Sequence, residues 1–290
     1  MRLIDHYVLV ADNLSSARER YQRMGFTVAP NGVHPFGTYN ANMYFRSGPM
    51  IETLAVEDAV KYAQAIQDGN TFVKNDAAFR DRHGHDGFSH IVTTSLDADK
   101  DHSDYLALGV SGGDLVSFTR RFEKPDGTLD TVSAKLAFAT HPKALSGYFF
   151  TCEDVIVPKI DRSSLLEHEN TTLGARQVLS CTRNPEIYRD FYHTLFAMTE
   201  ASSGHETIEC QLENGRVSLQ TPDQIASEYG IEQTLSDTEL RHRGLIFGVD
   251  NLGAVENLFN RNQVGFNRHK DRLIVAHHSQ WGAFFGFEPA

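Results

Sequence analysis

The chain has 290 residues, of which 40% are hydrophobic, and its formal net charge is -11 at pH 7. This length accommodates one large domain or two ordinary ones, and the apolar content supports a sizeable core. The acidic balance, with no basic run, argues against nucleic acid as a partner, because that binding depends on Lys and Arg side chains neutralising phosphates.

The first predicted unit occupies the N-terminal sixty residues. Residues 8–11 form a short apolar stretch that predicts a strand. The helix predicted after it has an N-cap pair, one apolar face and a terminal glycine: Asp12-Asn13, Leu14, Ala17, Tyr21 and Gly25. Strand-like segments then follow at 26–28, 40–45 and 50–55.

The second predicted unit follows a connecting segment, residues 57–87. This segment is expected to contain a short helix at 60–66 and a loop at 80–87. The second unit then repeats the plan, with a strand at 91–94 and a helix that follows Asp97 and ends at Gly109. Its later strands are predicted at 115–122, 129–138 and 148–152.

Two further units are predicted in the C-terminal half. The third has a strand at 175–181, a helix capped by Asn184, and two strands that meet at the hairpin signal Asn214-Gly215. The fourth has a strand at 245–247, a helix capped by Asp250-Asn251, and strands at 264–266, 272–276 and 283–287. Each unit is therefore a strand, a helix and two or three strands, and the polar stretch 161–172 divides the four units into two pairs.

Several short motifs accompany these units. They are Leu3-Ile4-Asp5-His6, Gly32-Val33-His34-Pro35, Gly37-Thr38, Asn40, Asn42, Ile51-Glu52-Thr53-Leu54, Phe149-Phe150, His168-Glu169-Asn170 and Gly174-Ala175. The repeated unit and these motifs resemble the vicinal-oxygen-chelate superfamily and, within it, the glyoxalase-like domain family. The resemblance covers residues 1–60 and 140–220.

The resemblance implies an α+β fold in which four βαβββ modules are paired into two cupped mixed-sheet halves, of the glyoxalase/bleomycin-resistance/dioxygenase type. Residues 1–160 would form the half with the metal and substrate cup. Residues 161–290 would form a second half whose site is degenerate.

The resemblance also implies a divalent metal ion in the first cup, held by the first and last strands of the two units. The matching positions are His6, Glu52 and His90, with Glu153 or Thr151 as the fourth. Two imidazoles and a carboxylate with open positions suit Fe, Mn, Ni or Zn. Purely structural roles are the alternative: an edge histidine for His6, an exposed strand face for Glu52, and one of several clustered histidines for His90.

Substrate contacts are expected from the loop over the cup mouth, which contains His34, Thr38 and Asn40. His34 would bind substrate or carry a proton near neutral pH, and a structural turn is the alternative. His168 and Asn170, in the linker between the halves, would contact substrate or serve packing and capping roles.

These assignments predict a metal-dependent lyase or isomerase acting on a small carbonyl-containing substrate that is chelated through vicinal oxygens, with Glu52 and His34 as catalytic residues. A non-catalytic, resistance-type protein that binds a small molecule is the alternative. An Fe(II) extradiol dioxygenase is less well supported, because its histidine positions in the second half carry Arg176 or Gln177 and an out-of-step His242, and its last strand offers Gly286.

The compartment is expected to be the cytoplasm. The three cysteines, Cys152, Cys181 and Cys210, match no disulfide or metal pattern and are expected to be reduced. No signal peptide and no apolar stretch of about 18 residues is present, so no membrane association is expected. The resemblance is compatible with a homodimer.

Overall fold

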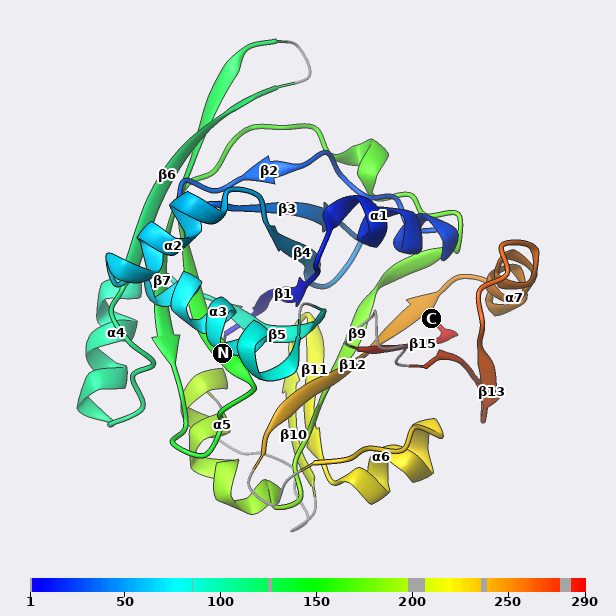
Figure 1. Ribbon diagram of the computed structural model, residues 1–290. Coiled ribbons are helices and arrows are strands. Elements are labelled where there is room, and N and C mark those ends of the chain that lie inside the picture. The colour runs from blue at the N-terminus through cyan, green and yellow to red at the C-terminus, as the bar shows by residue number, and fades with distance from the viewer. Residues whose placement is uncertain (1, 85, 125–126, 198–206, 236–238, 277–282) are drawn as a thin grey trace.

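The computed structural model describes residues 2–84, 86–124, 127–197, 207–235, 239–276 and 283–290 (Figure 1). These residues form an α+β structure with two mixed β-sheets, one in each half of the chain. This confirms the predicted α+β class with two mixed sheets, one made of the N-terminal strands and the other of the C-terminal strands.

The N-terminal sheet contains eight strands. They are β1 (Ile4–Val10), β2 (Gly32–Val33), β3 (Thr38–Met43), β4 (Met50–Val56), β5 (Gly87–Thr94), β6 (Val116–Glu123), β7 (Leu129–Ala139) and β8 (Tyr148–Ile156). Their order across the sheet is β2-β3-β4-β1-β5-β8-β7-β6. The strands β1 and β5 run antiparallel at the centre, and each has a parallel neighbour on its other side, β4 or β8.

The C-terminal sheet repeats this plan with seven strands. They are β9 (Thr172–Cys181), β10 (Thr207–Leu212), β11 (Gly215–Gln220), β12 (Arg241–Val249), β13 (Asn267–His269), β14 (Arg272–Val275) and β15 (Phe284–Pro289). Their order is β10-β11-β9-β12-β15-β14-β13, with β9 and β12 antiparallel at the centre. Two strands follow the helix of the third unit in the described residues, as the sequence predicted.

The helices are α1 (Leu14–Arg23), α2 (Ala59–Gln67), α3 (Thr71–His83), α4 (Ala98–Ala107), α5 (Arg189–Phe196), α6 (Pro222–Tyr229) and α7 (Leu252–Arg261), with 3₁₀ turns η1 (Ser163–Leu165) and η2 (Pro185–Tyr188). The side chains of Asn13, Asp97 and Asn251 accept backbone N–H groups at the starts of α1, α4 and α7, as predicted. Asn184 makes no such bond, because a 3₁₀ turn intervenes before α5. None of the described helices has the length and apolar content that crossing a bilayer requires.

Helix α3 corrects the predicted loop at 80–87. The helix continues to His83, and Arg80 lies on its buried face. The guanidinium of Arg80 donates to Asp76 Oδ2 at 2.8 Å and to the carbonyls of Ala11 and Leu54 at 3.0 and 3.1 Å. The polar residues that suggested a loop therefore include a buried ion pair that attaches α3 to the ends of β1 and β4.

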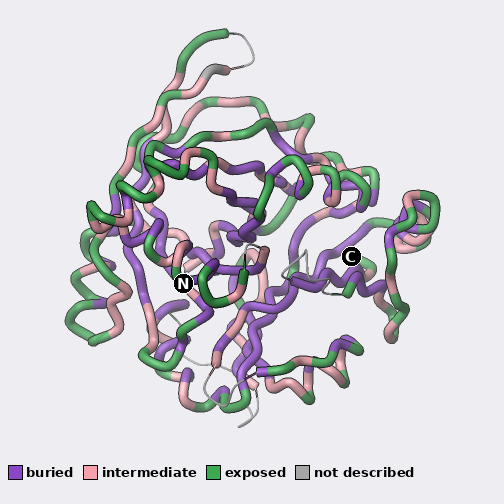
Figure 2. The backbone as a smooth tube through the Cα atoms, in the orientation of Figure 1, coloured by how far each residue is buried: buried purple, intermediate pink, exposed green. Residues whose placement is uncertain are grey.

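The two halves share a hydrophobic core between their sheets. Tyr7, Ile91 and Phe149, from the N-terminal sheet, belong to the same buried cluster as Val178 and Leu245, from the C-terminal sheet. Figure 2 shows the buried positions running through both sheets. The opposite face of the N-terminal sheet is covered in part by α2 and α3, and this is the face that holds the site. The three cysteines are free and buried.

Candidate metal and substrate site

A cavity of about 380 Å³ opens on the inner face of the N-terminal sheet. Polar side chains reach it from β1, β3 and β4 and from the β2–β3 segment, and aromatic side chains form much of its wall. The polar group comprises His6 on β1, Asn40 on β3 and Glu52 on β4, with His34 from β2–β3. The aromatic residues are Phe36, Phe72, Phe118 and Phe150. Few polar groups within an apolar lining are typical of small-molecule sites.

Glu52 is the centre of the polar group. Its Oε1 accepts from Asn40 Nδ2 at 2.5 Å and lies 3.7 Å from His34 Nε2, while its Oε2 lies 3.4 Å from His6 Nε2. The other ring nitrogen of His6, Nδ1, contacts Asp5 Oδ1. Because Glu52 is only 6% exposed, its charge depends on these partners. The alternative for Glu52, an exposed strand face, is thereby ruled out.

The electrostatics make His6 and Glu52 an ion pair. Burial alone lowers the pKa of His6, but hydrogen bonds to Asp5 and Glu52 outweigh it and raise this pKa to about 10. Burial alone raises the pKa of Glu52, but the hydrogen bond from His6 and the nearby His34 and Asn40 lower it to about 2. At neutral pH His6 is therefore positive and Glu52 negative.

His34 differs from His6 in being neutral. Burial is the main reason that its pKa is lowered to about 4. Its Nδ1 lies 2.9 Å from the hydroxyl of the fully buried Thr38, and its ring stacks on Phe36 with centroids 5.0 Å apart. Thr38 therefore orients the ring, and Nε2 of a neutral imidazole faces Glu52.

The register of the central strands shows which residues of the two units correspond. Residues 6–8 of β1 pair with residues 92–90 of β5, and a bulge residue stands at each end of this stretch, Asp5 on β1 and Ser89 on β5. A two-fold rotation about the centre of this stretch superposes β1 on β5 and places the bulge at Asp5 on the bulge at Ser89. The same rotation places His6 on His90, as the sequence alignment expected.

The register also identifies the fourth position. Glu52 pairs with Val8 on one side of the centre, and Phe150 pairs with Val92 on the other. The rotation that superposes His6 on His90 also superposes Val8 on Val92. Their partners on the neighbouring strands, Glu52 and Phe150, are therefore equivalent. An apolar ring thus occupies the position where a fourth ligand was expected.

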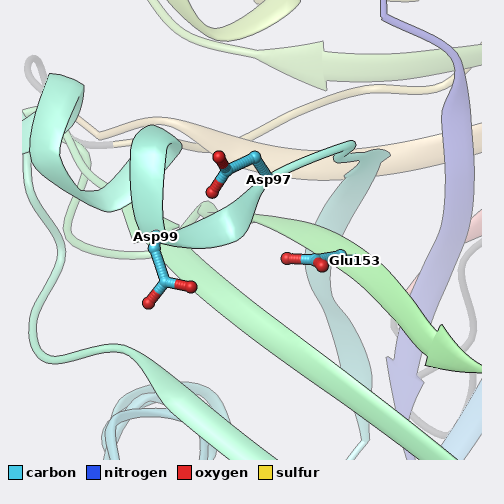
Figure 3. A group of neighbouring side chains, drawn as sticks. All are labelled: Asp97, Asp99 and Glu153. Carbon is cyan, nitrogen blue, oxygen red and sulfur yellow. The ribbon is translucent and has the colours of Figure 1, made fainter.

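Glu153 lies outside this group, which corrects its expected role. Its Oε2 accepts from the backbone N–H of Ala98 at 2.8 Å at the start of α4, near Asp97 and Asp99 (Figure 3). Glu153 and Thr151 share one strand face, and it is the face opposite to Phe150. The sequence alignment had placed the fourth ligand an odd number of residues away from Phe150. Such a shift puts the side chain on the opposite face of the sheet.

His90 is the most enclosed of the four candidates. It is fully buried, and the rings of Phe72 and Phe150 lie 5.9 and 5.4 Å from its own. Its Nδ1 is 2.8 Å from Ser89 Oγ, whereas its Nε2 is buried with no hydrogen-bond partner. Burial lowers the pKa of His90 to about 3, so the imidazole is neutral, the form that binds metals.

His168 and Asn170 are placed away from the cavity. The ring of His168 accepts from the N–H of Thr27 at 3.0 Å through Nδ1 and donates to the carbonyl of Tyr44 at 2.9 Å through Nε2. The amide of the fully buried Asn170 donates to the carbonyl of Met24 at 2.8 Å. Both residues bind backbone groups of the first unit and neither lines the cavity, which corrects their expected role as substrate contacts.

The C-terminal sheet lacks the donors at the corresponding positions. Bulges at Arg176 and Arg243 frame its central pairing, and counting from them places Gln177, Ser218, Gly244 and Gly286 at the positions of His6, Glu52, His90 and Phe150. The Gln177 amide donates to Ser218 Oγ at 2.8 Å. His242 instead bonds Ser180 Oγ and the Tyr148 carbonyl. This arrangement speaks against a metal site in the second half.

Two donors of the N-terminal half, His6 and Glu52, are spaced to bind one divalent ion. The 3.4 Å between His6 Nε2 and Glu52 Oε2 is close to the separation of two donors that each lie about 2.1 Å from one tetrahedral ion. The Nε2 of His90 has no other partner, but His90 does not line the cavity, and its donor atoms do not lie within 4.8 Å of those of both His6 and Glu52. Binding of one ion by all three would require side chains to move, and Phe150 is the ring that packs on both His6 and His90.

Sequence reasoning did not find the aromatic wall or Arg120, which also lines the cavity. Phe118 and Arg120 alternate along β6, and Phe36 and Phe72 come from a loop and from α3. No motif links these segments, and the alternation in β6 was the one available signal.

The two mixed sheets and the polar group of the N-terminal sheet are typical of the vicinal-oxygen-chelate class. The chain belongs to the family described as Glyoxalase-like domain, whose model matches residues 4–196. The comparison with curated protein sequences gives no match.

Solved structures agree on the fold. A hypothetical protein from Staphylococcus aureus has 13% identity and a TM-score of 0.68, with 100% of both chains covered. A mutant of 4-hydroxymandelate synthase from Streptomyces coelicolor has 12% identity and a TM-score of 0.57, covering 99% of this chain and 92% of that one. The Mn(II)-bound glyoxalase from Novosphingobium aromaticivorans has 8% identity and a TM-score of 0.54, covering 100% and 84%.

Proposed function

We propose that the chain is a metal-dependent enzyme of the lyase or isomerase type that acts on a small carbonyl-containing substrate. The observation that carries this proposal is the buried Glu52 carboxylate between His6, His34 and Asn40, at the wall of a cavity large enough for a small molecule.

His6, Glu52 and His90 would hold the divalent ion, which supplies a Lewis acid for a carbonyl or enolate oxygen. Fe, Mn, Ni and Zn all accept two imidazoles and a carboxylate. The solved Mn(II)-bound glyoxalase of the same fold supports this choice. Ligands bind metals in their deprotonated form, so His6 has to release its proton on binding.

The remaining residues support proton movement in the cavity. His34 presents Nε2 beside the Glu52 carboxylate, whose negative charge opposes the burial that lowers the pKa of His34, so a proton taken from a bound substrate would be stabilised on this ring by Glu52. Thr38 fixes the orientation of this ring through Nδ1. Asn40 holds the Glu52 carboxylate in place, so of the two expected catalytic residues, Glu52 and His34, His34 is the better proton carrier.

A non-catalytic protein that binds a small molecule is the second candidate. Phe150 stands at the fourth ligand position, and it packs against His6 as well as against His90. An aromatic cavity of this kind binds apolar compounds without a metal ion.

Elemental analysis of protein purified without chelators or a His-tag tests the first candidate. We expect near-stoichiometric divalent metal in the wild type, its loss in the His6→Ala/Glu52→Ala double variant, and its retention in His34→Gln. The Asp97→Ala/Glu153→Ala variant is the control, because it removes two of the three carboxylates in the acidic cluster at the start of α4. No metal after reconstitution with Fe(II), Mn(II), Ni(II) and Zn(II) would overturn the proposal and leave the second candidate.

A further inference from the structure

Arg120 brings a positive charge to the cavity beside the polar group. Its side chain lines the cavity from β6, and its Nη1 donates to the carbonyl of Val33 at 3.3 Å. A methyl group on Gly32 would lie 2.5 Å from this Nη1 and 2.6 Å from Asn40 Oδ1. The guanidinium therefore packs against the same glycine as Asn40, the residue that holds Glu52.

The guanidinium has no acidic partner within ion-pair distance among the residues that the structure describes. Its Nε is buried without a hydrogen-bond partner. Glu52, the carboxylate whose charge acts on it, is already bonded to Asn40 and paired with His6. A half-buried cation that lacks a counterion is costly, and a bound anion removes that cost.

The other cavity arginine is in a different situation. Arg162 lies over the ring of Tyr44, 4.8 Å from its centroid, and its charge acts on Asp154 at the same rim. Arg120 is thus the cavity cation that is free to bind an anion. The nearby carboxylates Asp5, Glu52 and Asp154 disfavour a doubly charged ligand.

The surroundings of Arg120 also specify the body of the ligand. Phe118 lies two residues before it on the same strand face, and the Phe118 ring meets those of His34 and Phe36 edge-on at 5.6 and 5.5 Å. Val132 and Ala134 on β7 continue this apolar wall. A planar or apolar group attached to the anion would pack there.

We propose that Arg120 binds the carboxylate of an organic acid whose apolar body lies against Phe36 and Phe118. This assignment names the substrate class of the same cavity and so rests on the proposed function. The carboxylate would anchor the substrate at one end and place its carbonyl group toward His6, His34 and Glu52.

The test compares two probes of the same shape, 3-phenylpropanoate and its neutral amide, 3-phenylpropanamide. Their affinities are measured by isothermal titration calorimetry with the wild type, Arg120→Gln and Arg121→Gln. Arg121 is the matched control, because it follows Arg120 on β6 but is exposed and does not line the cavity. Each titration is made with the purified protein and again after loading with Mn(II).

We expect the wild type to bind the carboxylate at least about tenfold more tightly than the amide, as a charge-assisted hydrogen bond gives. Arg120→Gln should lose this preference and Arg121→Gln should keep it. Gly32→Ala, which crowds the guanidinium, should reduce it. Equal binding of the two probes by the wild type, no binding of either, or an unchanged preference in Arg120→Gln would overturn the inference.

The two proposals fail separately in this design. A carboxylate preference that depends on Arg120, together with no uptake of Fe(II), Mn(II), Ni(II) or Zn(II), would retain the acid-binding site and contradict the metalloenzyme. Uptake of Mn(II) with no preference between the probes would retain the metalloenzyme proposal and contradict the acid-binding site.

Discussion

At the residue scale, the feature that most distinguishes the two halves of the N-terminal site is the pair Glu52 and Phe150. The register assigns them equivalent positions across the central strands. One supplies a carboxylate that is paired with His6, and the other supplies a ring that packs on His6 and His90. We therefore expect metal affinity to be limited by the missing fourth donor rather than by the other three.

The Phe150→Glu variant should bind divalent metal more tightly than the wild type. The new carboxylate stands where the symmetry of the strands requires a ligand, and an added charged donor should raise affinity by about tenfold or more. The buried charge should also destabilise the metal-free protein, and metal should restore the melting temperature. Competition with a fluorescent chelator measures the affinity.

The Phe150→Gln variant is the control for this prediction, because it has a similar shape and no charge. Tighter binding in Phe150→Glu alone would support a site between β1, β4, β5 and β8. Unchanged affinity in both variants would place any metal elsewhere.

At the element scale, helix α3 positions the aromatic residues of the cavity. Phe72 is in its first turn and Arg80 in its last. Arg80 donates to Asp76 and to the carbonyls of Ala11, just after β1, and Leu54, within β4. Tyr62 on α2 donates to the same Asp76 at 2.6 Å. This buried network joins both helices to the sheet that carries the site.

The Arg80→Met variant should lose about 3–5 kcal/mol of unfolding free energy, because it leaves the fully buried Asp76 without its cation. Urea denaturation followed by circular dichroism measures the loss. The Arg80→Met/Asp76→Leu double variant should recover part of it.

Arg46→Met serves as the comparison for that measurement, since Arg46 pairs with Glu167 on the surface. Its effect should be small, as is usual for exposed ion pairs. A loss in Arg80→Met no larger than in Arg46→Met would show that the network does not hold α3.

At the scale of the whole molecule, the linker residues 168 and 170 attach the second half to the first. Asn170→Ala should remove about 1–3 kcal/mol of unfolding free energy, because the Met24 carbonyl and the Thr172 N–H lose their partner in a fully buried place. Metal content should remain that of the wild type. A loss of metal with unchanged stability would contradict the structural role and support Asn170 as part of the metal and substrate site.

Asn262→Ala is the matched variant for this measurement. Its amide also crosses between the halves, to the carbonyl of Arg23 at 2.9 Å, but its side chain is partly exposed. The loss of stability should therefore be smaller than in Asn170→Ala.

The interface between the sheets should also make stability depend on pH. Burial lowers the pKa of His242 to about 3, although its hydrogen bond to the Tyr148 carbonyl opposes the shift. The unfolded chain takes up a proton below about pH 6.5, whereas the folded chain excludes it until about pH 3. Stability is thus lost as pH falls through this window, by up to about 1.4 kcal/mol per pH unit.

The His242→Gln variant should show a shallower loss of stability than the wild type between pH 7 and pH 5, measured by urea denaturation at each pH. His102→Gln, on helix α4 and only partly buried, is the control. Parallel curves for the wild type and His242→Gln would show that this histidine is not the cause.

Much of the fold could be predicted from the sequence because its signals are local. Cap residues such as Asn13 and Asn251, the hairpin signal Asn214-Gly215 and the periodicity of apolar side chains each act within a few residues of the chain. The repeat also aligned His90 with His6, whereas the resemblance to the glyoxalase-like domain family marked His6, Glu52 and His90 as candidate ligands.

Tertiary structure alone decided which side chains meet. Glu153 and Phe150 differ by three positions on one strand, so their faces, and with them the fourth ligand position, depended on a register that no local signal determines. Arg120, Phe72 and Glu52 are far apart in sequence and are brought to one cavity by the order of the strands and the placement of α3. Composition and spacing fix the elements, whereas strand pairing and burial fix their chemistry.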